Sequence, residues 1–298
     1  MEITFLGTAS AVPTEKRNHS AILVSFNNEN ILIDCGENAQ QQFRKAKLNP
    51  CKLTRILITH WHADHVLGLP GLLQTLEMSG YSKTLQIYGP KGTKENMTSI
   101  ERLFGKIRIN MQVHEISGQF LNEKDFQIHA EQMPHGIITN AYSIILKDKR
   151  RLYKEKLKKL KIPNSPLLKK LQEGKDIIFN KKKIKSSQVS YLEKGKKITI
   201  ILDTSFSNKA ISLAKNSDIL ISEASFLANS PNGEKLAKEY KHLTAKQAAT
   251  IAKKAKVKKL ILTHISQRYS KNPELLLKEA REIFKSTILP NDLDKISQ

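Results

Sequence analysis

The chain has 298 residues, 39% of them hydrophobic, which is enough to bury one large core or two small ones. Its two cysteines exclude a disulfide framework, and no apolar run approaches the roughly 18 residues of a membrane span. The 50 basic residues outnumber the 28 acidic ones and give a net charge of +22, which favours a polyanionic partner; a generally lysine-rich proteome is the alternative explanation. The segment after Met1 lacks the features of a secretory signal, so we expect a cytoplasmic protein without a membrane anchor.

Short apolar runs bounded by turn residues predict strands in both halves of the chain. In chain order these are Ile3–Leu6, Ala21–Phe26, Asn30–Asp34, Arg55–His60, Leu85–Tyr88, Phe126–Glu131, Tyr142–Leu146, Ile198–Asp203, Ile219–Glu223 and Leu260–His264. Helical patterns follow several of them, at Gln40–Ala46, Leu69–Met78, Lys209–Lys215, Ala245–Lys254 and Glu274–Phe284. This alternation predicts a layered α/β protein.

Four metal-ligand side chains crowd into six positions directly after the apolar run Ile56–Ile58. Residues two apart at an extended strand end point the same way, so His60 and His62 can hold one ion. Asp64 and His65, in the turn that follows, can face a second ion. Zinc accepts imidazole and carboxylate ligands, so the cluster predicts a zinc site; a chance group of solvated polar residues is the alternative.

Four predicted strands end in an ionisable residue, at His60, Asp203, Glu223 and His264. A buried strand followed at once by such a residue is how a rigid sheet presents chemistry at its edge. Any one of them alone could simply mark where a strand meets solvent. Together with the histidine cluster, the four predict one shared site.

The positive charge is concentrated between Lys147 and Lys197, where 19 Lys and Arg stand against 5 Asp and Glu, a net charge of +14. Pro163, Pro166 and Gly174 interrupt this stretch, which indicates an excursion from the core. Neutralisation of phosphates is the commonest use of so dense a basic block, so we expect a nucleic-acid-binding arm. A disordered linker or a solvated helix face are the alternatives.

These motifs together resemble tRNase Z, the tRNA 3′-processing endonuclease family of the metallo-β-lactamase superfamily. The resemblance covers both halves of the chain and is carried by Phe5-Leu6-Gly7-Thr8, Arg17-Asn18, Asp34-Cys35-Gly36-Glu37, the cluster His60–His65, Gly68-Leu69-Pro70-Gly71-Leu72-Leu73, His242-Leu243-Thr244 and Thr263–Tyr269. It implies a metallo-β-lactamase-like αββα sandwich of two mixed sheets with outer helices. Residues 1–298 would form this single domain, with a basic arm at 147–197 inserted in it as the tRNA-binding exosite.

The resemblance also implies the site residues. His60, His62 and His135 would hold a first zinc ion, and Asp64, His65 and His264 a second, with Asp203 bridging the two; manganese is the alternative metal. Substrate contacts would come from Arg17, Arg268, Ser165, Pro166, Lys169 and Lys170.

The chain departs from the family at Ala63, Leu202 and Ser222, where the family has Gly, Gly and His, and none of these is a ligand. Ser165 stands where the family's arm has the glycine of a Gly-Pro pair. Serine adopts positive φ less readily than glycine, so we expect a different turn geometry there.

A mechanism follows for precursor tRNA as substrate. Asp64 would orient the attacking water, and His242, positioned by Glu223, would donate a proton to the leaving 3′-oxygen. The products would be a tRNA 3′-hydroxyl and a trailer 5′-phosphate. For His242 the alternative is a helix-start residue beside Thr244, which is itself expected to cap the helix from Ala245.

Two other classes of protein would explain part of the sequence. Another two-zinc hydrolase of this fold, such as a phosphodiesterase, lactonase or thioesterase, would need the ligands but not the arm. A non-catalytic RNA-binding protein on this fold would need the arm but not the ligands. The chain has both, which favours the nuclease, and the resemblance further implies a homodimer.

Overall fold

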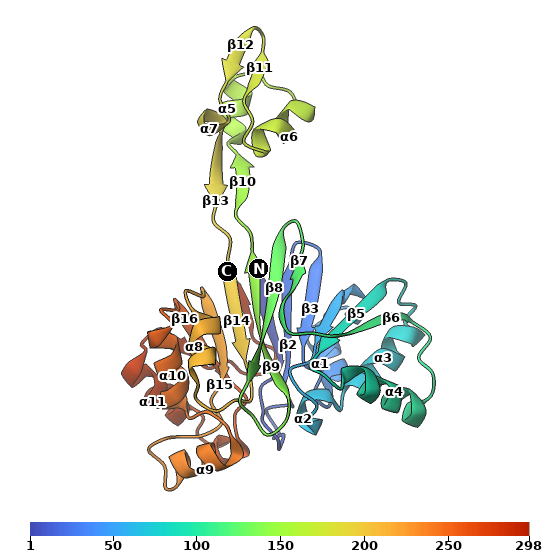
Figure 1. Cartoon of the computed structure of the whole chain (residues 1–298), viewed down its shortest axis with the longest axis vertical. Helices are drawn as coiled ribbons and strands as arrows, with labels where there is room; N and C mark the ends of the chain where they lie inside the picture. Colours follow the sequence, from blue (N-terminus) through green and yellow to red (C-terminus); the bar gives the residue numbers. More distant parts are fainter. Residues whose placement is uncertain (298) are drawn as a thin grey trace.

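The chain folds into two facing β-sheets with helices on their outer faces, and an arm extends away from this sandwich (Figure 1). The structure is a computed structural model that describes residues 1–297. The first sheet has the order β18 (Lys295–Ser297), β1 (Glu2–Gly7), β2 (Ala21–Phe26), β3 (Glu29–Ile33), β4 (Arg55–Leu57), β5 (Thr84–Gly89), β6 (Asn110–Glu115). The second has the order β17 (Thr287–Ile288), β16 (Lys259–Thr263), β15 (Ile219–Glu223), β14 (Lys197–Ile201), β9 (Thr139–Leu146), β8 (Phe126–Met133), β7 (Gly118–Asn122).

Helices bury the outer face of each sheet. The first sheet packs against α1 (Ala39–Lys45), α3 (Leu69–Met78) and α4 (Thr93–Phe104), and the second against α8 (Asn208–Ala214), α10 (Ala245–Lys254) and α11 (Glu274–Ile283). Successive strand residues point to opposite faces, so Ile56 packs towards the helices while Leu57 packs between the sheets. Because both faces are buried, these strands are continuous apolar runs. Among the helices of residues 1–297, none has the length and apolar character that crossing a bilayer requires.

The predicted fold class is confirmed, and each predicted strand and helix falls on one of these elements. The strand ends differ, since β4 stops at Leu57 and His60 lies beyond the strand, in a segment without regular secondary structure. The sequence patterns missed α4, α9 (Gly233–Tyr240) and the peripheral strands β6, β7, β17 and β18. α4 and α9 bury few side chains, and β6 and β7 are half exposed, so none of them forms a buried apolar run that stands out in the sequence.

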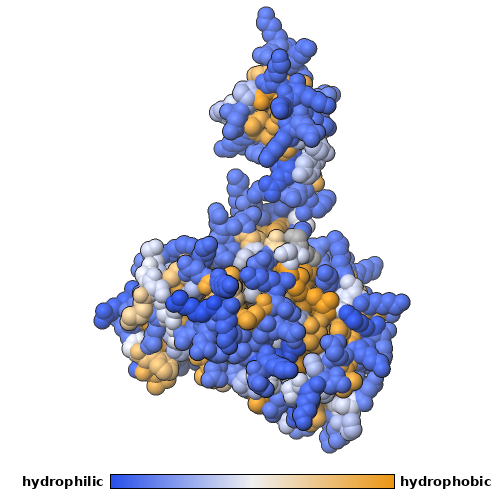
Figure 2. All heavy atoms as spheres, turned by 180° about the vertical axis from the view of Figure 1, so that it is seen from behind, coloured by the Kyte–Doolittle hydropathy of each residue, from blue (hydrophilic) through white to orange (hydrophobic). Residues whose placement is uncertain are grey.

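The arm leaves the sandwich after β9 and returns at β14. Its stalk is an antiparallel pair, β10 (Lys149–Leu152) with β13 (Ser190–Glu193). Beyond the stalk lie α5 (Lys154–Lys159), α6 (Pro166–Gln172), the hairpin β11 (Ile177–Phe179) with β12 (Lys182–Ile184), and α7 (Ser186–Val189). Figure 2 shows hydrophilic side chains over most of the arm's surface.

The arm has a small apolar core of its own. This arm core consists of Leu157, Ile162, Leu171, Ile177, Ile184 and Val189, with four further apolar side chains packed around it. Gly174, at φ 83°, turns the chain after α6. Ser165 stands at the N-cap position of α6 with an extended backbone at φ −148° and no capping hydrogen bond. The position therefore does not require glycine, and the expected disturbance of the turn is absent.

Candidate metal centre

The ligand side chains emerge where strands of both sheets end. β14, β15 and β16 are parallel neighbours, so the residues at their carboxyl ends lie at one edge of the second sheet. Asp203, Glu223 and His264 are those residues. β3 and β4 are parallel in the first sheet, and the chain beyond β4 carries His60 towards the same edge.

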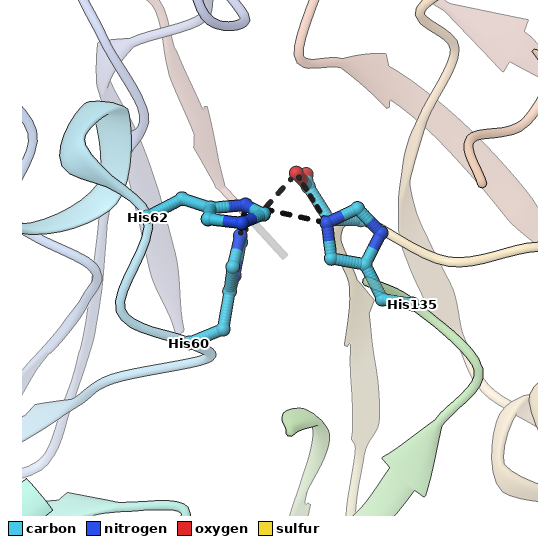
Figure 3. Close-up of side chains that lie close together, drawn as sticks. His60, His62 and His135 are labelled. Carbon is cyan, nitrogen blue, oxygen red and sulfur yellow. Dashed lines mark hydrogen bonds and ion pairs between the residues drawn. The ribbon is translucent and has the colours of Figure 1, made fainter. Parts of the chain in front are cut away.

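Three imidazoles and one carboxylate converge between the sheets (Figure 3). His60 Nε2 and His135 Nε2 lie 3.0 Å and 3.3 Å from His62 Nδ1. Asp203 Oδ2 lies 3.4 Å from His60 Nε2 and 3.7 Å from His135 Nε2. The structure therefore brings together the four predicted ligands of the first ion, which we call the first ligand group.

A second ligand group lies on the other side of Asp203 and contains Asp64, His65 and His264. Asp203 Oδ1 lies 3.2 Å from His264 Nε2 and 3.5 Å from His65 Nε2. Asp64 Oδ2 lies 3.3 Å and 3.4 Å from the same two nitrogens. Asp203 thus presents one oxygen to each group, as a bridging ligand must.

Both groups fit a divalent cation. Tetrahedral zinc at its usual bond lengths separates its ligand atoms by about 3.3 Å, and the closest ligand-to-ligand distances in the two groups run from 3.0 to 3.7 Å. Asp203 Oδ1 is buried and accepts no hydrogen bond. His135 Nδ1 lies 3.0 Å from the carbonyl of Lys241 and donates to it, so its Nε2 carries a lone pair towards the group. The lone pair of His135 Nε2 and the carboxylate oxygen Asp203 Oδ2, 3.7 Å away, repel each other unless a cation lies between them.

The protonation states of Asp203, Asp64, His135 and His62 suit metal ligands, whereas the carboxylates of Asp203 and Asp34 outweigh burial and raise the pKa of His65. Burial favours protonated carboxyl groups, but the surrounding histidines hold the pKa of Asp203 well below its usual range. Burial would also raise the pKa of Asp64, but hydrogen bonds from His264 and His65 hold it well below its usual range. Burial lowers the pKa of His135 to about 4 and lowers that of His62. At neutral pH both carboxylates are therefore ionised and these two imidazoles are neutral.

His242 stands beside both ligand groups. Its ring centroid lies 5.2 Å from that of His135 and 5.5 Å from that of His264. Its Nδ1 lies 2.9 Å from Oε2 of Glu223, a fully buried carboxylate. Burial alone would lower the pKa of His242, but the carboxylate of Glu223 raises it to about 9. The structure therefore places a protonated imidazole next to the centre, where it can serve as a proton donor.

Asp34 is a functional candidate that the sequence interpretation missed. It is fully buried, and its Oδ2 lies 2.7 Å from His65 Nδ1 while its Oδ1 accepts from the backbone N–H of Thr59 at 2.7 Å. A carboxylate behind a ligating imidazole orients the ring and fixes its tautomer. Asp34 has a φ of 57°, which is unfavourable for a non-glycine residue. Such strained backbone conformations cluster at functional sites. The available signal was the predicted strand Asn30–Asp34, which also ends in an ionisable residue.

Arg17 is buried and does not present its guanidinium to a substrate. Its side chain is 4% exposed, and it donates to Thr8 Oγ1 at 2.6 Å, to the Pro290 carbonyl at 2.8 Å and to Asn291 Oδ1 at 2.9 Å. These bonds tie the loop after β1 to the segment after β17. The prediction that Arg17 contacts substrate is therefore wrong, because its guanidinium is already engaged inside the protein.

The other predicted substrate residues lie in two places. Arg268 is exposed and follows the predicted ligand His264 by four positions. Its guanidinium lies 5.6 Å from the ring centroid of Phe226 and donates to Ser266 Oγ at 3.3 Å. The rest, on and before α6, are Ser165, Pro166, Lys169 and Lys170. Figure 1 shows α6 in the arm, well away from the ends of β14 and β15. The arm residues therefore do not join the metal centre of their own chain.

Several known proteins are similar to this chain over most of its length. Residues 1–193 match the family model described as Anti-Pycsar protein Apyc1. The matched region ends before Asp203. Ribonuclease Z from Listeria welshimeri is 39% identical over 302 aligned positions, covering 98% of each chain. Ribonuclease Z from Methanothermobacter thermautotrophicus is 38% identical over 296 positions, covering 98% of this chain and 95% of its own.

Solved structures show the same relationship. The short form of human tRNase Z superposes with a TM-score of 0.72 and 27% identity, covering 100% of this chain and 99% of its own. The metallo-β-lactamase fold protein YhfI from Bacillus subtilis gives a TM-score of 0.71 at 19% identity, with coverage of 99% and 98%, and shows the fold alone.

Proposed function

The chain belongs to the ribonuclease Z family, and on that premise we propose that it is the metal-dependent endoribonuclease that removes the 3′ trailer from precursor tRNA. One observation carries this proposal. The chain is related to ribonuclease Z over 98% of its length, and it contains both ligand groups complete. The arm adds a second requirement of such an enzyme, a surface that binds RNA.

Two divalent ions would be held by the first and second ligand groups, with Asp203 shared. Imidazoles and carboxylates in sets of four favour zinc, and manganese is the alternative. When bound, such a pair of ions activates water and neutralises negative charge on a phosphate during in-line displacement.

The chain's own residues supply orientation and the proton. Asp64, whose carboxylate stays ionised, accepts a hydrogen bond from the attacking water and orients it. His242 donates its proton to the leaving 3′-oxygen, because it is protonated at neutral pH and lies beside both ligand groups. Glu223 holds the His242 ring and stabilises its charge. Cleavage leaves a 3′-hydroxyl on the tRNA and a 5′-phosphate on the trailer.

The arm would hold the tRNA at a distance from the cut. Four of its five acidic side chains already pair with basic neighbours, in Arg151–Glu193, Lys175–Glu173, Lys183–Asp176 and Lys194–Asp148. Exposed lysines on α5 and α6, including Lys158, Lys159, Lys169 and Lys170, add to this charge and are available to phosphates. We extend the proposal to a homodimer in the cytoplasm, in which one subunit's arm holds the RNA that is cut by the other.

The alternative is another hydrolase of the same fold, because residues 1–193 also match a second family model. Specificity constants for a 3′-extended precursor tRNA, an aryl phosphodiester and a lactone separate the two functions. We expect kcat/KM for the precursor to exceed the small-substrate values by several orders of magnitude. Comparable values for precursor tRNA and small substrates would overturn the assignment.

A further inference from the structure

Thr59 links a buried carboxylate to a ligand of the first group. Its Oγ1 lies 2.7 Å from Asp34 Oδ2 and 3.0 Å from His60 Nδ1, and the side chain is fully buried. A hydroxyl has one proton, and Thr59 Oγ1 donates it to the carboxylate oxygen at the shorter distance. Thr59 Oγ1 must then accept from the Nδ1–H of His60, which leaves the lone pair of His60 on Nε2, the atom that faces the first group.

Ser225 makes the same connection in the second group. Its Oγ donates to Glu223 Oε2 at 2.8 Å and lies 3.0 Å from His264 Nδ1. Ser225 Oγ also lies 3.0 Å from the His264 carbonyl, which, like the carboxylate, accepts a hydrogen bond. With its one proton given to these acceptors, Ser225 Oγ accepts from the Nδ1–H of His264. The lone pair of His264 is then on Nε2, 3.2 Å from Asp203 Oδ1.

We propose that Thr59 and Ser225 are positioning residues that extend two buried carboxylates to four imidazoles. Asp34 holds His65 directly and His60 through Thr59; Glu223 holds His242 directly and His264 through Ser225. The two hydroxyls act on different ions, because His60 belongs to the first ligand group and His264 to the second. This inference rests on the proposed metal-dependent function.

Removal of either hydroxyl leaves a buried Nδ1–H without an acceptor and frees the ring to take the other tautomer. Loss of a partner behind a ligating imidazole lowers metal affinity by about 10 to 100-fold. Thr59→Val should therefore weaken the first ion, and Ser225→Ala the second. A role in packing alone predicts a different order of effects, which matched variants can reveal.

Matched variants separate the effect of losing the hydroxyl from the effect of disturbed packing. Thr59→Ser keeps the hydroxyl and loses the methyl group, whereas Thr59→Val keeps the shape and loses the hydroxyl. Ser222→Ala is the matched control for Ser225→Ala, because it also removes the hydroxyl of a fully buried serine. The Oγ of Ser222 donates to the Glu223 carbonyl at 3.1 Å and hydrogen-bonds to no imidazole within residues 1–297. We expect Thr59→Ser and Ser222→Ala to bind zinc as the parent does.

The test is zinc competition against a chelator, with stoichiometry read by native mass spectrometry on the full chain. The parent should bind two ions, and Thr59→Val and Ser225→Ala should each lose affinity for one ion by about 10 to 100-fold. In a His135→Ala background, which cripples the first group, Thr59→Val should leave the remaining ion unchanged while Ser225→Ala still weakens it.

The outcomes distinguish this inference from the function beneath it. A parent protein that binds no metal overturns the proposed function and this inference with it. A parent that binds two ions, with Thr59→Val and Ser225→Ala both at parental affinity, overturns the inference alone. Equal losses in Thr59→Val and Thr59→Ser would assign Thr59 to packing and also refute the proposal for it.

Discussion

The arm can lose charge without losing its fold, which allows its role to be tested apart from the metal centre. Lys158 and Lys159 on α5, with Lys169 and Lys170 on α6, are exposed and lie outside the arm core. Replacing all four by glutamine removes four positive charges and keeps the side-chain lengths nearly unchanged. We expect precursor tRNA to bind more weakly because phosphate contacts are lost.

The size of the effect follows from counterion release. Each lost phosphate contact removes roughly 0.7 to 0.9 from the slope of log affinity against log salt, so four contacts remove about 2.8 to 3.6. If the affinities at about 1 M salt are equal, this slope change corresponds to a loss on the order of 10³-fold at about 0.1 M salt.

Fluorescence anisotropy with labelled precursor tRNA over a salt series measures both quantities. The matched control carries the same change of charge on exposed body lysines, at Lys235, Lys253, Lys271 and Lys278. Hydrolysis of an aryl phosphodiester should be the same in all three proteins. An unchanged slope in the arm variant, or an equal change in the control, would refute the proposal that the arm binds tRNA.

Four other changes test the site and the fold. His62→Ala should lower metal content below two ions per chain and abolish hydrolysis, and full activity after exhaustive chelation would contradict the metal proposal. His242→Gln should keep metal content and tRNA affinity while slowing cleavage by about 10² to 10⁴, with a smaller loss on an aryl phosphodiester that needs no proton donor; an equal loss on both would make His242 structural. Leu171→Ala should destabilise the arm core by about 2–5 kcal/mol and speed hydrogen exchange in the arm but not in the sandwich. Arg17→Met should lower the free energy of unfolding by about 1–3 kcal/mol in urea titrations, because the acceptors on Thr8, Pro290 and Asn291 lose their buried donor, whereas Lys16→Met on the exposed loop should not.

The strands and most of the metal centre could be predicted from sequence because they share one cause. A strand buried on both faces is a continuous apolar run, and a ligand such as Asp203 or His264 directly after it stands out. Asp34, Thr59 and Ser225 were missed because a single buried acid or hydroxyl at a strand end resembles an ordinary strand boundary. Their roles appear only when the parallel strands bring them behind the imidazoles.

Two other features needed the fold itself. Arg17 resembles a surface arginine in a polar loop, and its acceptors at Pro290 and Asn291 lie at the far end of the chain. The arm core is hidden by composition, because residues such as Leu157 and Ile184 stand among lysines and give no sustained period. Packing of distant segments decides both cases, and no local pattern records it.

The most direct measurement is to map the cut in a 3′-extended precursor tRNA and identify the new ends. The account predicts a single cut directly after the discriminator base, with a 3′-hydroxyl on the tRNA and a 5′-phosphate on the trailer. Stepwise shortening from the 3′ end, a cut elsewhere in the tRNA, or a 2′,3′-cyclic phosphate at the new end would contradict it.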